Sequence, residues 1–383
     1  MKDILYQCWV LMRCAAYALV HGRATRLVAQ PKTVCVVQVA QLGDMVCTTP
    51  LFRAIKIRYP AARLVVVGTA ANRGVLAGNP HVDEYVAWEG SSIQMAHRLH
   101  ACALDFACVT NPNASGLAAL YLAGVPHIVA PRIVGGVCPT DAKAYRLLRL
   151  LANVVSYTFG SYTPREYLRL LEPIGINTSD TRKQVFYTDA AAARVVEKLR
   201  AVAILPSAVS NKTAFAIIAP SAGNKIKRWP PERFARVAEY VARRMPVVVV
   251  GATADKEEVA EMFAHVSSPR VYNFCEQTSL DELKALIARA RLFISGDTGP
   301  LYIAEALGVP TIDIVGPVSE RDQPPNNPPR HIVIAPPRDA PAMHALNSRI
   351  HDAAEVHRQA AATTVAEVVA AIDVMLLHVV PRE

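Results

Sequence analysis

The strongest constraint on the fold is an alternation of short apolar runs with helical stretches, which occurs twice along the chain. The first half contains TVCVVQVA, ARLVVVG and LDFACVT, and the second contains AFAIIAP, PVVVVGA and RLFISGD. Each run is followed by a segment with helical periodicity. Apolar runs of this length between helices are typical of parallel βαβ units. The pattern therefore predicts an α/β protein with two doubly wound, parallel sheets.

The length of 383 residues suits two domains. Between residues 132 and 210 the alternation is replaced by basic helical patterns such as YRLLRLLANVV, and we place a linker near residues 205–213. Ligands of open parallel sheets bind beyond the carboxyl ends of the strands, so we expect the chemistry in a cleft between the domains. The predicted parts are an extension at 1–32, a first domain at 33–208, a second domain at 209–360 and a closing helix at 361–383.

The formal net charge of +9 and the pI near 9.2 favour anionic partners. Aromatic residues do not alternate with Lys/Arg clusters, and no zinc-finger or RNA-binding signature occurs, so nucleic acid is not an expected partner. The eight cysteines form no CxxC pair, and most lie in apolar runs. We interpret them as reduced packing residues of a cytoplasmic protein, and we expect no metal site.

An apolar stretch at residues 4–20, ILYQCWVLMRCAAYALV, is interrupted only by Gln7 and Arg13. It is short for a membrane span, and Arg13 would be costly in lipid. The start carries no net positive charge and no clear cleavage site follows before Pro31, which argues against a signal peptide. Two interpretations stay open, which are a helix on the anionic inner-leaflet surface and a helix packed on the protein's own surface. The cations that favour the first are His21, Arg23, Arg26 and Lys32.

A Gly-Asp pair follows the first apolar run, in QLGDMVCTTP (41–50). Gly43 provides backbone freedom for a sharp turn, and Asp44 then projects from the turn or from the first helical residue. In the alternative interpretation, Asp44 only caps a helix or favours its dipole, while Thr49 caps a helix that has Pro50 at its first position. This window alone does not choose between a functional and a capping carboxylate.

A basic loop follows the first strand of the second domain, in SAGNKIKRWPPERF. The loop contains a serine hydroxyl, free backbone N–H groups and lysine ammonium groups. It lies just before a helix that is expected to start at Pro230 and Pro231. This setting suits phosphate better than a merely solvated basic loop does. Trp229 is interpreted as a packing residue. The candidate phosphate contacts are Ser221, Gly223, Lys225 and Lys227.

A third strand-turn-helix window, FISGDTGPLYIAEALG, places Gly296 and Gly299 around Asp297 and Thr298. A helix cap would explain Asp297 or Thr298 taken alone. It does not explain why a Gly-Asp turn follows a strand in both halves. The sequence has no GxGxxG after the first strand, and it lacks the P-loop, HExxH and GxSxG motifs.

Together with NPHVDEYV, these windows resemble glycosyltransferase family 9, the lipopolysaccharide heptosyltransferases, over about residues 33–320. The resemblance implies a GT-B fold of two Rossmann-like domains facing a central cleft. It also implies transfer of heptose from ADP-heptose, with inversion, to a lipid-linked core glycan acceptor. The nucleotide sugar is a substrate, and the resemblance implies no required cofactor or metal ion.

The resemblance also implies roles for single residues. Asp44 matches the family's proposed general base, and Lys227 matches the lysine that contacts the donor phosphate. Residues 297–299 match the nucleotide-binding DTG, and Asp255 lies about where the family has an acidic ribose contact. Tyr302 replaces the family's His, and VAQ precedes the Gly-Asp pair in place of a Ser-rich approach. Both departures leave the transferred sugar open.

The acceptor is expected to meet the first domain and the basic region after it. The arginines of this basic region have two interpretations, which are contact with acceptor phosphates and simple solvation on a basic helix. Two rival functions stay open, which are a nucleotide-sugar epimerase or hydrolase of the same fold and a catalytically silent nucleotide- or glycan-binding protein. The candidate acceptor contacts are Gly43, Arg146, Arg149 and Arg165.

Overall fold

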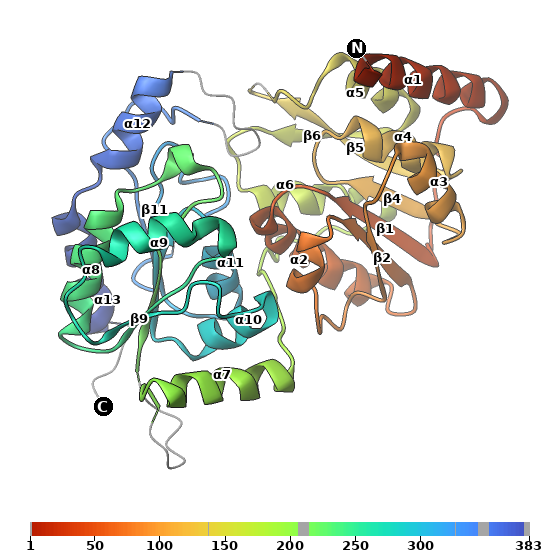
Figure 1. Cartoon of the computed structure of the whole chain (residues 1–383). Coiled ribbons are helices and arrows are strands. Elements are labelled where there is room, and N and C mark those ends of the chain that lie inside the picture. Colours follow the sequence, from red (N-terminus) through yellow and green to blue (C-terminus); the bar gives the residue numbers. More distant parts are fainter. Residues whose placement is uncertain (1, 137, 206–213, 326, 344–351, 379–383) are drawn as a thin grey trace. The chain divides into compact units, whose positions relative to one another are not determined.

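The computed structural model describes residues 2–136, 138–205, 214–325, 327–343 and 352–378. Two compact units divide the chain, Met1–Arg182 and Lys183–Glu383. Each unit contains one six-stranded parallel sheet whose strands alternate with helices, as Figure 1 shows. The predicted α/β class with two doubly wound domains is therefore confirmed.

The first unit is built on the strand order β3-β2-β1-β4-β5-β6. At its centre, Val34 of β1 lies opposite Leu64 of β2 and Phe106 of β4, and all three side chains are fully buried. The strands are β1 Thr33–Gln38, β2 Arg63–Gly68, β3 Glu84–Ala87, β4 Phe106–Val109, β5 His127–Val134 and β6 Asn153–Thr158. The helices are α1 Lys2–His21, α2 Leu42–Arg58, α3 Ser92–His100, α4 Ala114–Leu122, α5 Lys143–Leu148 and α6 Thr163–Arg169, with 3-10 turns η1 Ala71–Val75, η2 Arg149–Leu151 and η3 Glu172–Ile174.

The second unit has the strand order β12-β11-β10-β7-β8-β9. Ile294 of β10 lies opposite Ile312 of β11 and Ile218 of β7 in its fully buried centre. The strands are β7 Ala216–Ala219, β8 Val247–Val249, β9 Val271–Asn273, β10 Leu292–Gly296, β11 Thr311–Ile314 and β12 His331–Ile334. The helices are α7 Asp189–Ala201, α8 Pro231–Ala242, α9 Lys256–Phe263, α10 Leu280–Arg289, α11 Gly299–Ala306, α12 Ala353–Ala362 and α13 Val365–His378, with 3-10 turns η4 Lys225–Lys227 and η5 Thr253–Asp255.

Helix α7, which the sequence places in the first domain, packs against α10 of the second unit. Two polar contacts fasten it there, because Thr188 Oγ1 lies 2.7 Å from Asp281 Oδ2 and Arg194 Nε lies 2.8 Å from Glu282 Oε1. The compact units therefore divide at Arg182/Lys183, whereas the sequence boundary is drawn at 208/209. The linker expected near 205–213 lies almost wholly outside the described residues.

The basic region also differs from its predicted form. The run YRLLRLLANVV reads as one helix in the sequence, but α5 ends at Leu148 and a strand, β6, begins at Asn153. The β-branched pair Val154 and Val155 favours a strand and pairs with Ala130 and Pro131 of β5. Leucine periodicity outweighed this short strand signal in the sequence.

Helix α2 begins earlier than expected, at Leu42. Gly43 therefore lies in the first turn of the helix instead of forming a sharp turn. The alternative in which Thr49 caps a helix that starts at Pro50 is wrong. Pro50 has no N–H for the carbonyl of Val46, four residues earlier. Thr49 Oγ1 donates to that same carbonyl oxygen at 2.7 Å, which allows proline inside a continuous helix.

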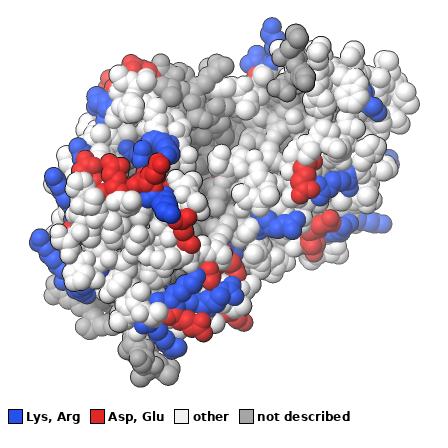
Figure 2. All heavy atoms as spheres, in the orientation of Figure 1, with Lys and Arg blue, Asp and Glu red and all other residues white. Residues whose placement is uncertain are grey.

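Helix α1 packs on the first unit through one face and exposes the other. Tyr6, Val10, Cys14 and Tyr17 contact or enter the core beside α4 and α5. Residues 4–21 are long and apolar enough to cross a membrane by length and composition, and 11% of them are buried. The surface over α1 carries few charged side chains in Figure 2.

Candidate active site

The turn between β1 and α2 in the first unit is fixed by two buried amides. Gln38 Oε1 accepts a hydrogen bond from the Ala40 N–H at 3.1 Å, and its Nε2 donates to Thr48 Oγ1 at 3.1 Å. Asn72 Nδ2 donates to the Ala40 carbonyl oxygen at 2.8 Å. Gln38 and Asn72 are almost fully buried. These contacts hold the chain where it delivers Asp44, and sequence reasoning missed both amides.

Asp44 is the third residue of α2 and is half-buried. Its Oδ2 accepts a hydrogen bond from the Gln41 N–H at 3.1 Å, so the carboxylate does cap the helix start, where the helix dipole favours negative charge. Capping does not exclude a chemical role, because an ionised carboxylate has about four acceptor positions. The charge of Asp44 adds to burial in raising the pKa of Tyr167, so the two groups lie near each other.

The three arginines proposed for acceptor binding do not gather at one place. Arg165 is exposed on α6, which packs against the helix of Asp44. Arg146 and Arg149 both pair with Asp141, at 3.3 and 3.2 Å. They belong to α5 and η2, and α5 packs against α4 and α1. Arg165 is therefore the one of the three whose helix contacts the Asp44 helix.

The donor-type residues of the second unit meet beyond β7 and β10, which are neighbours in the sheet. Lys227 Nζ lies 2.8 Å from Asp297 Oδ2, and the two side chains are only 18% and 7% exposed. Tyr302 Oη donates to the other carboxylate oxygen of Asp297. A lysine, an aspartate and a tyrosine thus form one connected group at the carboxyl ends of the strands. We call these residues the Lys227 group.

Helix capping does not account for the acidic turn of the second unit. Thr298 is the N-cap of α11, but its side chain makes no capping hydrogen bond, and Gly299 is the first helical residue. The carboxylate of Asp297 instead pairs with Lys227 and accepts a hydrogen bond from Tyr302. The alternative that the Asp-Thr pair is merely a cap is therefore not supported by the geometry.

The other predicted donor contacts differ in their burial and in their position relative to β7. Ser221 is buried just after β7, and a Cβ added to Gly223 would meet open space, which leaves room for a ligand beside its backbone. Asp255 follows β8, the other neighbour of β7, and accepts from the Ala252 N–H at 2.8 Å. Lys225 is 59% exposed and lies 3.6 Å from Glu257 and Glu258, so it is separate from the Lys227 group.

A buried lysine, Lys183, contacts the ring of Tyr302. The side chain of Lys183 is fully buried, and its Nζ lies 2.5 Å from Glu305 Oε2 and 3.0 Å from the Gln323 carbonyl oxygen. The same ammonium lies 4.9 Å from the centre of the Tyr302 ring, within cation–π range. No sequence motif marked Lys183, because its partners are far away along the chain.

Asp313 of β11 is buried beneath the same site, in register with Ser295 of β10. Neither of its carboxylate oxygens has a hydrogen-bond partner among the described residues. Burial, and then the charge of Asp297, hold the pKa of Asp313 well above its usual range, against the opposing effect of Lys227 and Lys183. Asp322 is similar, since burial and Asp297 raise its pKa to about 6. An aspartate inside the apolar run TIDIVGP was the available sequence signal for Asp313.

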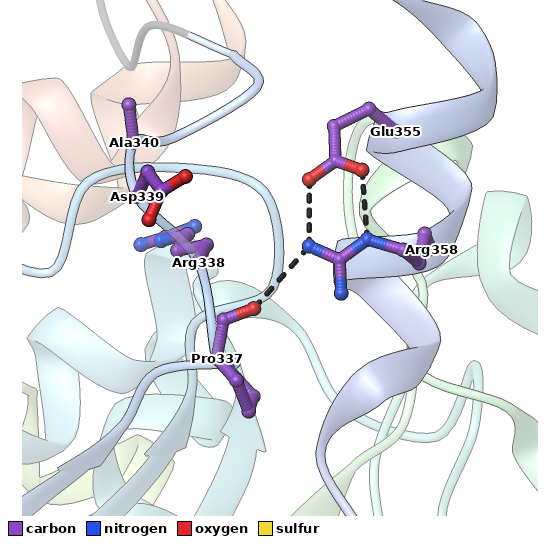
Figure 3. A pocket seen from close by; sticks show the side chains of 6 residues that line it. All are labelled: Pro337, Arg338, Asp339, Ala340, Glu355 and Arg358. Atoms are coloured by element: carbon purple, nitrogen blue, oxygen red, sulfur yellow. Dashed lines mark hydrogen bonds and ion pairs between the residues drawn. The ribbon is translucent and has the colours of Figure 1, made fainter.

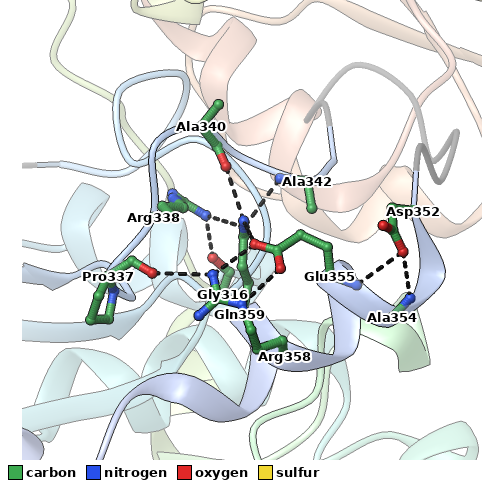
Figure 4. Close-up of polar contacts among 10 residues, drawn as sticks. All are labelled: Gly316, Pro337, Arg338, Ala340, Ala342, Asp352, Ala354, Glu355, Arg358 and Gln359. Carbon is green, nitrogen blue, oxygen red and sulfur yellow. Dashed lines mark hydrogen bonds and ion pairs between the residues drawn. The ribbon is translucent and has the colours of Figure 1, made fainter.

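An open hollow of about 710 Å³ lies beside α12 and is lined by polar side chains, shown in Figure 3. Arg358 pairs with both oxygens of Glu355 at 2.7 Å and donates to the Pro337 carbonyl oxygen at 3.2 Å. Arg338 is nearly buried and joins the loop after β11 to α12, because it donates to the Val318 carbonyl oxygen at 2.5 Å and to Gln359 Oε1 at 3.1 Å. Figure 4 shows its contact with Gln359.

This network supports the donor-type residues, because α12 also contacts η4, which carries Lys227. A Cβ added to Gly316 would lie 3.5 Å from both the Ala360 Cα and the Lys227 carbonyl oxygen. The loop after β11 therefore passes between α12 and η4 in close contact. Since Arg358 pairs with Glu355 and Arg338 pairs with Glu320, we interpret the hollow as a structural support.

Known proteins resemble this chain in sequence and in fold. The pattern of glycosyltransferase family 9 (heptosyltransferase) matches residues 166–350. Lipopolysaccharide heptosyltransferase 2 of Escherichia coli K12 is 24% identical over 305 residues, which are 74% of this chain and 82% of that protein. The glycosyl transferase family 9 structure from Veillonella parvula has a TM-score of 0.71 at 19% identity and covers 92% of this chain and 99% of its own. The structure of E. coli ADP-heptose lipopolysaccharide heptosyltransferase II has a TM-score of 0.69 at 21% sequence identity. The match covers 90% of this chain and 98% of that chain.

The two Rossmann-like units, each with polar residues beyond its strand ends, form the GT-B fold that these structures share. The chain resembles the heptosyltransferases of glycosyltransferase family 9, and these similarities support a glycosyltransferase. The predicted resemblance, fold and enzyme class are thereby confirmed.

The buried carboxyl of Asp313 generates a stability prediction. Its folded-state pKa lies above the unfolded value, so the unfolded chain ionises first as pH rises, and this costs the wild-type protein stability above about pH 4. Asparagine does not titrate. The free energy of unfolding of Asp313→Asn, relative to that of wild type, should therefore rise between pH 4 and pH 7, and this gain should disappear again on acidification toward pH 4. Chemical denaturation across this range measures it.

The control is Asp83→Asn in the first unit, where the pKa is lowered by hydrogen bonds from Leu64 N–H and Lys56 that outweigh burial. A lowered pKa stabilises the folded protein at neutral pH and loses that effect as pH falls. The control should therefore be less stable than wild type at pH 7, with a difference that also shrinks on acidification. A pH-independent difference at Asp313 would contradict a neutral buried carboxyl.

Proposed function

We propose that this enzyme transfers heptose from ADP-heptose, with inversion, to a hydroxyl group of a lipopolysaccharide-core or related lipid-linked glycan in the cytoplasm. The supporting observation is the Lys227 group, which places a buried ammonium beside a DTG turn at the carboxyl ends of β7 and β10. The names of the relatives support this donor and this type of acceptor, since they act on lipopolysaccharide and one is named for ADP-heptose.

On the donor side, Lys227 is positioned to meet a diphosphate. Its ammonium is mostly buried, where a charge interaction is stronger than in water. The open space beside Gly223 would let phosphate oxygens approach the backbone after β7. When the bond from the sugar to the diphosphate breaks, negative charge develops on the leaving phosphate oxygen. Lys227 would stabilise that charge, which is the usual way such a site lowers the barrier.

On the acceptor side, we assign the proton transfer to Asp44. An aspartate is normally ionised at neutral pH, so it accepts a proton without prior activation, as a weak base. In the proposed step, the acceptor oxygen forms a bond to the anomeric carbon and its proton moves to the Asp44 carboxylate. ADP leaves from the opposite face, which gives inversion. The turn fixed by Gln38 and Asn72 limits the motion of the carboxylate.

For the acceptor, Arg165 is the best supported of the predicted contacts, because its helix packs against the helix of Asp44. An acceptor phosphate would add a strong, charge-assisted partner for its exposed guanidinium. Arg146 and Arg149 already share Asp141, so they would have to exchange partners to bind. Gly43 stays a proposal for a close backbone approach.

Asp44→Asn tests the assigned base. The amide oxygen can still accept the Gln41 N–H, so the helix start should survive while proton transfer is lost. The kcat for transfer should fall roughly 100- to 10,000-fold, with unchanged affinity for ADP. Single-turnover assays and calorimetry measure the two quantities. The control is Asp105→Asn, which removes another carboxylate of this unit, one that accepts backbone N–H groups at Lys32 and Thr33. Wild-type kcat in Asp44→Asn would exclude Asp44 as the base.

A matched lysine pair tests the donor site. In thermal-shift measurements with ADP-, UDP- and GDP-sugars, ADP-heptose should stabilise the wild type in proportion to saturation. Lys227→Met should abolish the shift, whereas Lys225→Met should retain it, because Lys225 is exposed and lies toward Glu257 and Glu258. A response only to another nucleotide sugar would refute the heptose donor. Turnover of the donor without acceptor would favour the epimerase or hydrolase alternative, and binding without any turnover would favour a silent binding protein.

Tyr302→Phe tests whether the tyrosine tunes the Lys227 group. Without its hydroxyl, the charge of Asp297 is balanced by Lys227 alone, which leaves less of the lysine's charge for phosphate. Loss of a hydrogen bond to a charged group should weaken ADP binding roughly 10-fold or more. Tyr145→Phe is the control, since it also loses a buried hydrogen bond, to the Pro131 carbonyl at 2.7 Å, but in the first unit. Equal ADP affinity in both variants would contradict the role of Tyr302.

A further inference from the structure

Helix α1 is apolar on two faces, and only one of them is covered. The inward face consists of Tyr6, Val10, Cys14 and Tyr17, at a helical spacing of three or four residues. It is fastened by polar contacts as well, because Tyr6 Oη accepts a hydrogen bond from the Ser92 N–H at 3.0 Å. The Tyr17 ring packs edge-on against Tyr121, 5.4 Å between centres. The helix is thus held in one rotational setting on the first unit.

The outward face of α1 is exposed although it is apolar. The exposed fractions reach 90% at Leu19 and 78% at Val20. A surface helix normally carries polar residues on this side, and large exposed apolar patches usually mark an interaction site. Figure 2 shows little charge over this helix. We call the following residues the α1 surface: Ile4, Leu5, Trp9, Met12, Leu19 and Val20.

Apolar exposure continues on the elements that lie beside α1. Leu147 of α5 is 56% exposed and Leu150 of η2 is 64% exposed. Helix α5 contacts α1, and the Ala24 N–H after α1 donates to the Leu151 carbonyl oxygen at 2.8 Å. The exposed leucines therefore belong to elements packed together in one unit, separate from the turn that carries Asp44.

The charge of this region is one-sided. No Asp or Glu occurs from Ile4 to Gly43, whereas Arg13, Arg23, Arg26 and Lys32 are all present. The Arg13 guanidinium lies 5.1 Å from the centre of the Trp9 ring. Tryptophan and arginine are typical of the boundary between lipid and water, where one part of the side chain is apolar and another is polar.

We propose that the α1 surface docks the protein on a bilayer that contains anionic phospholipid. Apolar side chains would enter the headgroup region, and the surrounding cations would meet lipid phosphates. A second copy of the chain is a less favourable partner, because two such surfaces would bring uncompensated cations together. A membrane span would require Tyr6, Val10 and Tyr17 to leave the core, with Arg13 in the hydrocarbon. A helix that lies on the membrane keeps its inward contacts.

The purpose of this docking rests on the proposed function, because a lipid-linked acceptor is confined to a membrane surface. Binding to a surface raises the effective concentration of enzyme near such an acceptor. The docking itself depends only on α1 and its surroundings. It can therefore be measured without donor or acceptor, independently of the enzymatic proposal.

Vesicle cosedimentation of the full chain tests the inference. The protein should bind phosphatidylcholine vesicles that contain phosphatidylglycerol, bind pure phosphatidylcholine much less, and dissociate as salt rises. Leu5→Gln/Met12→Gln should reduce the partition coefficient roughly 100-fold. Arg13→Gln/Arg26→Gln should reduce it roughly 30-fold on anionic vesicles, with little effect on neutral ones. The control is Ile57→Gln, which removes another exposed apolar side chain, 71% exposed on α2, and should bind as wild type does.

The contradicting outcomes are distinct. Absence of binding, or binding that the Leu5/Met12 variant does not change, would overturn the docking. Self-association in analytical ultracentrifugation that this variant abolishes, without vesicle binding, would assign the surface to a second copy instead. Transfer to a water-soluble acceptor fragment separates the two proposals. The Leu5/Met12 variant should retain wild-type transfer in solution, so failed docking with intact transfer refutes only the docking, and docking without transfer refutes only the function.

Discussion

The ion pair between Lys227 and Asp297 is the interaction on which the second unit's site depends. A charge that is taken out of water needs a partner, and here each residue is the partner of the other. The pair also joins the loop after β7 to the loop after β10. Nearby, Lys183 is balanced by Glu305 in the same way. Two lysines are thus balanced by two carboxylates. Asp313 is a third carboxylate beneath the site, and burial together with the charge of Asp297 raises its pKa, which favours its neutral form. A neutral Asp313 does not repel an anionic ligand.

The position of this pair is set by parts of the chain that lie far away in sequence. The turn that carries Lys227 contacts α12, and the loop after β11 passes between them. Arg338 fixes that loop to α12 through backbone and side-chain acceptors. A site of this kind needs rigid support, because a displacement of about 1 Å weakens both binding and catalysis substantially. Helix α12 therefore helps to position the Lys227 group.

Much of the fold could be predicted because it follows from local patterns. Runs of Val and Ile between helical segments located most strands, and Gly, Asp and Lys at the strand ends located the candidate site. Strand β6 was missed because leucine periodicity extends up to it, and the start of α2 was missed because Pro50 resembles a first helical residue. Lys183 was missed because its role depends on neighbours that only tertiary packing brings near. Asp313 left one local signal, a carboxylate inside an apolar run, but its nearness to Asp297 is set by the pairing of β10 with β11 and not by a local pattern.

The two acidic turns show why the sequence could not separate capping from function. Asp44 accepts an N–H three residues before it, so the geometry that makes it a cap is encoded locally. Asp297 pairs with a lysine 70 residues away, and its neighbour Thr298 makes no side-chain capping bond. A local cap and a chemical role use different acceptor positions of one carboxylate and therefore coexist. If Asp44 is the base that we propose, this is an advantage, because the backbone contact at the helix start also restricts where the carboxylate can receive a proton.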